Sequence, residues 1–149
     1  MADFITDLSE DDARNSFLVG LVNALHISRK IIVLTDRREH CNKLCSLLEN
    51  SGLYLGGMKQ TELDVSASKR VIIASYPMAA EGLDIGDLDT VLLATPKTDV
   101  RQAIGRCMRM GGVRKNSPLV IDVVDKWGSL SIAMFNKRKR IYRSQNLLD

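Results

Sequence analysis

The sequence predicts an α/β domain in which helices cover both faces of a parallel β-sheet. Short apolar runs alternate along the chain with segments whose apolar residues recur at helical spacing. The runs are nearly continuous in apolar residues, so both faces of each strand should be buried. The chain has 149 residues, of which 45% are hydrophobic, enough for one self-sufficient core. We therefore expect one three-layer αβα domain over residues 1–149.

The first half of the chain alternates helix and strand patterns. Ser9 and Asp12 form a capping-box-like start for a helix, and Phe17, Leu18 and Leu25 continue it on an apolar stripe. A β-branched run then predicts a buried strand, and cysteines and leucines at helical spacing predict the next helix. The predicted elements are a helix over 9–25, a strand over 30–34, a helix over 37–50, a strand over 53–55, a glycine turn at 56–57 and a polar loop to residue 68.

The second half adds three strands and two helices. The apolar runs at 70–75, 90–94 and 118–124 have the length and composition of buried strands. A helix is expected around 100–109. A second one follows Trp127, where Leu130, Met134 and Ile141 form an apolar stripe and the basic run at 137–140 points outward. A nuclear-import patch, a nucleic-acid contact and a solvated helix face all fit this run.

Charge is distributed unevenly along the chain, although its net value is only +3. The first turns are acidic. Lys97 to Lys115 carries six basic residues against one acid, and Lys126 to Arg143 carries six more with no acid. This cationic second half indicates a local binding site for a polyanion. Because aromatic residues make up only 5% of the chain, phosphate contacts are a more natural use of these charges than base stacking.

Composition also excludes several classes of protein. No apolar run approaches the roughly 20 residues that span a bilayer, and the acidic N-terminus is unlike a signal or transit peptide. We expect a soluble intracellular protein of the cytoplasm or nucleus, without a membrane partner. The three cysteines do not make a disulfide framework. His40, Cys41 and Cys45 lack a fourth ligand, so we interpret them as structural and expect no metal site.

The segment QAIGRCMR at 102–109 carries the clearest chemical signal. On a helix, Gln102, Arg106 and Arg109 share one stripe, because positions i, i+4 and i+7 lie within roughly 60° of one another. The opposite face is apolar, and Asp99 is the only nearby acid. Gly105 in mid-helix costs about 1 kcal/mol relative to alanine. These features favour a surface that an anion approaches, and an ordinary solvated helix face is the alternative.

Ligands of open parallel sheets bind at the carboxyl ends of the strands, so the segments that follow the predicted strands are candidate sites. These segments are 35–38, 56–57, 75–84, 95–97 and 124–125. The third is the richest, since Ser75, Gly82 and Asp84 all follow one strand. A hydroxyl, glycine N–H groups and a carboxylate suit a phosphate and a ribose. A capped turn is the structural alternative.

These segments resemble a known family. QAIGRCMR is similar to the Q-x-x-G-R-x-x-R motif of superfamily 2 helicases, and ASYPMAAEGLDI at 74–85 to the strand-and-loop motif before it. VLTDRREHCNKL at 33–44 and YLGGMK at 54–59 resemble two earlier motifs of the same domain, in the same order. The likeness is to DNA-type helicases of the repair and recombination branch, including those of large DNA viruses and phages. It implies a RecA-like fold and the second of two RecA-like domains that hold ATP between them.

The resemblance implies roles for five residues toward ATP. Arg109 would be the arginine finger on the γ-phosphate and Arg106 a second phosphate contact. Gln102 would order the attacking water or link the two domains. Asp84 would hydrogen-bond the ribose of ATP. Gly82, which has no side chain, would leave space for the backbone beside it.

The resemblance also implies a nucleic-acid track. Ser75 and the Gly56-Gly57 turn would hold backbone phosphates, and Arg37 or Arg38 would touch the strand. Ser75 stands where threonine is commoner in the family, but the hydroxyl is retained.

The sequence contains no G-x-x-x-x-G-K-[ST] and no D-E-x-H or D-E-x-D, the motifs that cradle the β-phosphate and bind Mg²⁺. We therefore expect ATP and Mg²⁺ to be bound mainly by an N-terminal RecA-like partner domain, and the chain alone to be inactive. The expected function is that of the C-terminal motor domain of an ATP-dependent DNA helicase or translocase, with RNA as the other possible track. The alternatives are a stand-alone nucleic-acid-binding module and, more weakly, a small-molecule nucleotide enzyme.

Overall fold

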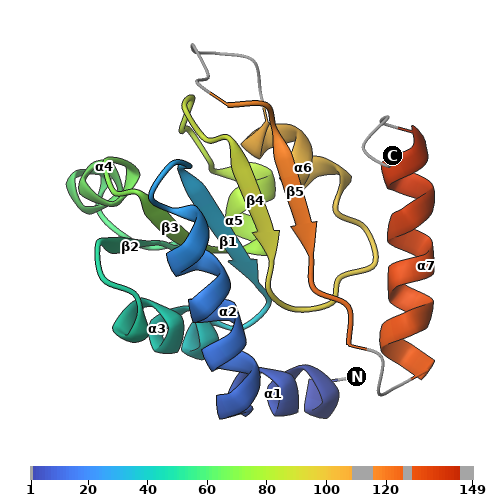
Figure 1. The fold of residues 1–149 in the computed structure, drawn as a ribbon. Helices are drawn as coiled ribbons and strands as arrows, with labels where there is room; N and C mark the ends of the chain where they lie inside the picture. The colour runs from blue at the N-terminus through green and yellow to red at the C-terminus, as the bar shows by residue number, and fades with distance from the viewer. Residues whose placement is uncertain (1, 109–115, 126–128, 145–149) are drawn as a thin grey trace.

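The computed structural model describes residues 2–108, 116–125 and 129–144, and it has the three layers that the sequence predicts (Figure 1). Its elements are α1 (Ala2–Glu10), α2 (Asp12–Leu25), β1 (Ile31–Thr35), α3 (Arg38–Leu47), β2 (Ser51–Tyr54), α4 (Gln60–Ala67), β3 (Val71–Ser75), α5 (Tyr76–Glu81), β4 (Thr90–Leu93), α6 (Arg101–Cys107), β5 (Leu119–Asp122) and α7 (Ser129–Ser144).

The sheet has five strands in the order β2-β3-β1-β4-β5, and every pairing is parallel. The central strand is β1, where Ile31 lies opposite Val71 of β3 and Thr90 of β4. All five residues of β1 are buried, as the continuous apolar run predicts. The predicted parallel α/β sheet is therefore confirmed.

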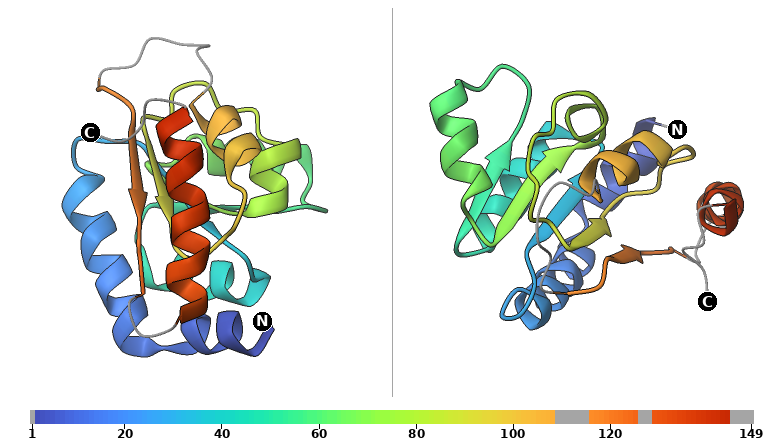
Figure 2. Two further views of the ribbon diagram at one scale, coloured as in Figure 1. Left: turned by 90° about the vertical axis from the view of Figure 1, so that its right-hand side faces the viewer. Right: turned by 90° about the horizontal axis from the view of Figure 1, so that it is seen from above.

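Alternate strand residues enter two hydrophobic cores, one on each face of the sheet (Figure 2). Ile32 and Leu34 of β1 belong to a core that α4, α5, α6 and α7 also enter. Ile31 and Val33 belong to the other core, which α2 and α3 cover. Burying one isoleucine, leucine or valine side chain fully contributes about 1.5–3 kcal/mol to the free energy of unfolding. In the described ranges, no helix is both long and apolar enough to cross a bilayer.

The N-terminal helix pair differs from the prediction. Ser9 does not cap α2: it lies within α1, where its hydroxyl donates to the Ile5 carbonyl at 2.8 Å. The N-cap of α2 is Asp11, whose carboxylate accepts from the Arg14 N–H at 3.0 Å. Phe17, expected on the apolar stripe, is 59% exposed. The side of α2 that faces inward is shifted because Arg14 and its neighbour Asn15 are buried in hydrogen bonds.

The predicted polar loop to residue 68 is wrong, since residues 60–67 form α4. This helix buries only Leu63 and Ser66, so its sequence shows little hydrophobic periodicity. It packs closely on β2 at Gly52, where a Cβ would lie 2.7 Å from the Ser66 Cα. Tertiary packing therefore forms a helix that the local pattern does not predict.

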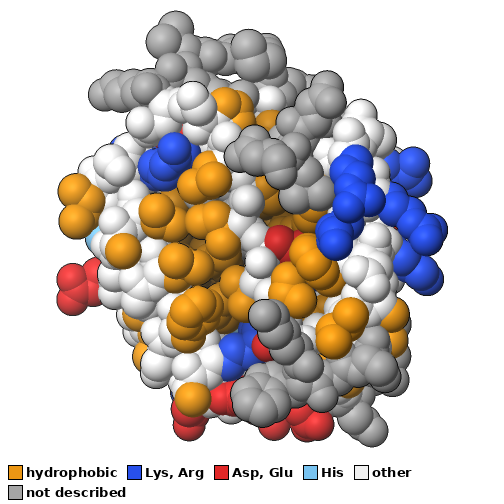
Figure 3. Space-filling model, turned by 45° about the vertical axis from the view of Figure 1, so that its right-hand side comes forward, with side chains coloured by type: hydrophobic (Ala, Val, Ile, Leu, Met, Phe, Trp, Pro, Cys, Tyr) orange, Lys and Arg blue, Asp and Glu red, His pale blue; other side chains and the backbone are white. Residues whose placement is uncertain are grey.

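The basic C-terminal helix also departs from expectation. Leu130, expected on its apolar stripe, is 39% exposed, and Ile141 is only half-buried. Arg138, expected to point outward, is 1% exposed and forms a two-pronged ion pair with Asp122 of β5. The residues of α7 that turn inward are Ser131, Met134, Arg138 and Tyr142. Basic side chains gather on the outer side of the helix, seen in blue on the right of Figure 3.

Candidate functional site

The segments predicted to bind ligand lie together at the carboxyl edge of the sheet. Because every strand is parallel, the segments after β2, β3, β1 and β4 follow one another along this edge in that order. The Gly56-Gly57 turn follows β2, Ser75 ends β3, and Asp36 to Arg38 follow β1. The residues expected to contact nucleic acid thus come from the ends of three neighbouring strands.

The glycine turn and Arg38 are in direct contact. Gly57 has a φ of +86°, a left-handed conformation that favours glycine. The Nη1 group of Arg38 donates to the Gly56 carbonyl at 3.1 Å, and both residues are exposed. This contact holds a cationic side chain beside exposed backbone, an arrangement suited to an anionic strand.

Ser75 and Arg37 are each engaged in a local contact. The Ser75 hydroxyl is the N-cap of α5 and accepts from the Met78 N–H at 3.4 Å. Arg37 lies 2.7 Å from Asp36 in a half-buried ion pair. Both side chains therefore have fixed positions at the strand ends.

Helices α5 and α6 lie side by side, which brings together the motifs that begin at residues 74 and 102. Arg106 of α6 donates through Nε to the Ala80 carbonyl at 3.3 Å and through Nη2 to the Glu81 carbonyl at 2.9 Å. Gly82, the C-cap of α5, is the next residue, and the exposed Asp84 follows closely. Arg106 is therefore anchored on α5 beside the loop that carries Gly82 and Asp84. Two of its five N–H donors are used in this way.

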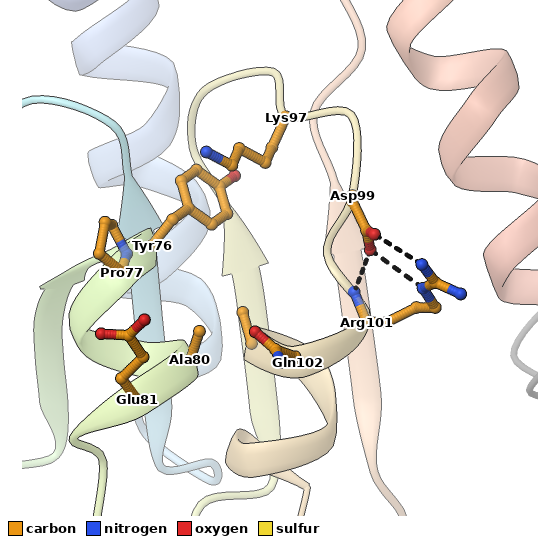
Figure 4. Close-up of a pocket in the computed structure, with 9 residues that line it drawn as sticks. Tyr76, Pro77, Ala80, Glu81, Lys97, Asp99, Arg101 and Gln102 are labelled. Carbon is orange, nitrogen blue, oxygen red and sulfur yellow. Dashed lines mark hydrogen bonds and ion pairs between the residues drawn. The ribbon is translucent and has the colours of Figure 1, made fainter.

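Gln102 is exposed and lines an open pocket of about 580 Å³ between the beginnings of α5 and α6 (Figure 4). Tyr76 and Lys97, which lie in the candidate segments 75–84 and 95–97 but had no predicted role, also line it. Tyr76 is buried and donates to the Thr95 carbonyl at 2.6 Å, and burial raises the pKa of its hydroxyl well above the usual value. The Lys97 ammonium lies 5.6 Å from the centre of the Tyr76 ring. Lys97 lies four residues after the end of β4, and this position near a strand end was the signal that could have identified it.

Arg101, the neighbour of Gln102 on α6, also borders this pocket, but its guanidinium is held by an ion pair. It is exposed and pairs with Asp99 through its Nη2 at 2.8 Å. Hydrogen bonds from Arg101 lower the pKa of Asp99. Figure 4 shows Arg101 directed toward Asp99 and away from Tyr76 and Glu81. Arg109, the expected arginine finger, lies outside the described residues.

His40 and its neighbouring cysteines are part of the core. The His40 Nε2 lies 2.8 Å from Asn15 Oδ1, and Nδ1 lies 2.5 Å from the Thr35 hydroxyl. Burial, with the nearby positive charge of Arg14, lowers the pKa of His40 to about 4. Burial raises the pKa of Cys41 to about 12. Within the described ranges, no group of three metal-ligating side chains comes together.

Comparison with protein families finds a match to the helicase conserved C-terminal domain over residues 13–111. A protein of Acanthamoeba polyphaga mimivirus named as an ATP-dependent RNA helicase is 41% identical over 129 residues, which is 81% of this chain and 25% of that protein. The ATP-dependent rRNA helicase RRP3 of Kluyveromyces lactis is 35% identical over 119 residues, 72% of this chain and 24% of its own length. The chain spans about a quarter of the length of these relatives.

Solved structures share the fold. T4 UvsW superposes with a TM-score of 0.75 at 21% identity, over 96% of this chain and 35% of that chain. The C-terminal domain of the DEAD-box protein Dbp5 superposes with a TM-score of 0.67 at 20% identity, over 93% of this chain and 82% of that chain.

Proposed function

Because the chain belongs to the family of helicase conserved C-terminal domains, we propose that it is the second RecA-like motor domain of an ATP-dependent DNA helicase or translocase. The expected superfamily 2 resemblance and RecA-like fold are confirmed. The observation that carries the proposal is the contact between Arg106 and the end of α5. It joins the two motifs expected to face ATP into one surface.

On the ATP side, Arg106 and Arg109 stabilise charge on the phosphates, and Gln102 orders the attacking water or links the domains. Asp84 hydrogen-bonds the ribose beside Gly82. The exposed carboxylate of Asp84 supports this assignment, as do the three N–H donors of Arg106 that bind no acceptor among the described residues. ATP and Mg²⁺ are held mainly by an N-terminal RecA-like domain of the same protein, which supplies the missing phosphate-cradling motifs.

On the nucleic-acid side, Ser75, Arg38 and the Gly56-Gly57 turn hold backbone phosphates at the carboxyl edge of the sheet. Arg37 contacts the strand beside them. Motif resemblance favours DNA, whereas the curated relatives are named as RNA helicases. Backbone contacts of this kind suit both polymers, so the test below uses both.

Replacing Arg109 in the full-length protein tests the proposal. An arginine finger acts on the transition state more than on ground-state binding, so Arg109→Ala should keep ATP and nucleic-acid binding while kcat falls by about 10³ to 10⁵. Arg109→Lys should rescue little, because a point charge replaces a planar fork. Steady-state ATPase is measured with saturating single-stranded DNA and, separately, RNA of the same sequence.

Arg101→Ala is the matched control, since Arg101 pairs with Asp99 away from Gln102. Its turnover should stay within a few-fold of wild type, and a thermal melt excludes unfolding. Equal losses at Arg101 and Arg109, or no loss at Arg109, would contradict the proposed function. Stimulation by RNA alone would change the proposed track from DNA to RNA.

A further inference from the structure

The rotation of α7 about its axis is fixed by a buried polar anchor. The Arg138 Nε and Nη2 groups donate to the two carboxylate oxygens of Asp122 at 2.7 and 2.9 Å. Its Nη1 donates to the Lys97 carbonyl at 2.7 Å, and the Tyr142 hydroxyl donates to Asp122 at 2.5 Å. The charges of the Arg138 guanidinium and the Asp122 carboxylate neutralise each other. Asp122 therefore does not offset the positive charge of the other basic residues of α7.

This anchor sets which basic residues face outward. On an α-helix, successive residues are about 100° apart, so Arg140 and Arg143 lie nearly opposite Arg138. Both are exposed, as is Lys137. Lys139 is half-buried, with its ammonium 5.4 Å from the centre of the Phe135 ring. Figure 3 shows the resulting gathering of blue side chains over α7.

The outward face lacks compensating charge. No acidic residue occurs between residues 129 and 144. Lys137, Arg140 and Arg143 form no ion pair with any residue in the part of the chain that the structure describes. An ordinary solvated helix carries both acidic and basic side chains, so that oppositely charged pairs at positions i and i+4 stabilise it. This face is built instead for an anionic partner.

The spacing and the packing of α7 favour a polyphosphate chain. Lys137 to Arg143 spans about 9 Å of helix axis, which lets the three charges contact neighbouring phosphates of one strand. A basic amphipathic helix that binds a membrane needs a free apolar face. Here Met134 and Tyr142 are buried against the domain, and the exposed apolar residues Leu130 and Ile132 lie in the first turn of α7, before the basic run.

We propose that Lys137, Arg140 and Arg143 form an auxiliary nucleic-acid-binding surface that contacts backbone phosphates outside the track at the carboxyl edge of the sheet. The proposal rests on the proposed function, because a helicase domain handles a nucleic-acid backbone. The contact is electrostatic and independent of base sequence. It strengthens the hold on the strand without contributing to ATP hydrolysis.

The test uses the full-length protein and a fluorescein-labelled oligodeoxythymidylate of about 20 nucleotides, longer than the site of a single domain. The triple variant Lys137→Gln/Arg140→Gln/Arg143→Gln should raise Kd about tenfold at about 50 mM salt. It should also lower the slope of log affinity against log salt by about 2, since each phosphate contact on a single strand contributes about 0.7. The kcat at saturating nucleic acid should stay unchanged.

Two control variants accompany the triple variant. Arg140→Lys/Arg143→Lys keeps the charge and should bind within twofold of wild type. Lys69→Gln removes a positive charge just before β3, which β1 and β4 separate from the edge strand β5 beside α7, and should also bind within twofold. An unchanged Kd or salt slope in the triple variant, or an equal loss per charge in Lys69→Gln, would overturn the proposal. A wild-type protein without nucleic-acid-stimulated ATPase would refute the proposed motor function instead, and the change in Kd would still decide the role of α7.

Discussion

At the scale of single residues, His40 is held in its neutral form by its surroundings. It is 1% exposed, and its two ring nitrogens contact Asn15 and Thr35. The Asn15 side chain in turn donates to the Ser9 carbonyl at 2.9 Å. This chain of polar contacts joins α1, α2, α3 and β1, so protonation of one ring affects the packing of four elements.

Stability should therefore fall as the pH falls through the range in which His40 titrates. The pKa of His40 is about 4 in the folded protein and about 6.5 in the unfolded chain. Between these values the unfolded state binds a proton that the folded state does not, which lowers the free energy of unfolding by about 2 kcal/mol from pH 7 to pH 5. Urea unfolding at both pH values measures the change. His40→Gln should flatten this dependence, whereas His26→Gln should not; equal slopes in wild type and His40→Gln would refute the assignment.

At the scale of elements, the attachment of α7 depends on the ion pair between Arg138 and Asp122. Arg138→Ala leaves the Asp122 carboxylate without its main partner, so we expect a loss of about 3–5 kcal/mol in the free energy of unfolding. The double variant Arg138→Ala/Asp122→Ala should lose less than the single variant, because no uncompensated charge remains. Chemical denaturation measures each variant.

The control for this pair is an exposed arginine on the same helix. Arg140→Ala should change the free energy of unfolding by no more than about 0.5 kcal/mol. Similar effects at Arg138 and Arg140 would show that the ion pair does not secure α7.

At the scale of the whole molecule, the proposed function assigns this chain one side of an ATP site and a cationic surface for nucleic acid. The purified chain should therefore bind single-stranded DNA in a way that weakens steeply between about 50 and 200 mM salt, and it should not turn over ATP. Fluorescence anisotropy and an ATPase assay measure the two properties. Binding that does not respond to salt would contradict the electrostatic model, and ATP turnover by the chain alone would contradict the two-domain model.

The strands could be predicted because burial on both faces leaves a continuous apolar run, as in β1 and β3. The strand-end location of Ser75 and the glycine turn followed from parallel topology. Helix α4 could not be predicted, since its place depends on the close approach of Gly52 to Ser66. The anchoring of Arg106 depends likewise on how α5 and α6 pack together. The inward turn of Arg138 requires Asp122, whose proximity is set by the docking of α7 and is absent from local sequence.

The hydrogen bond from Arg138 to the Lys97 carbonyl has a mechanical consequence. It joins α7 to the main chain of the loop that leads into α6, across 41 residues of sequence. The same guanidinium also binds Asp122 of β5, so one side chain connects the helix, the edge strand and the loop. Moving α7 away from the domain would therefore break a hydrogen bond to the loop that leads into the helix carrying Gln102 and Arg106.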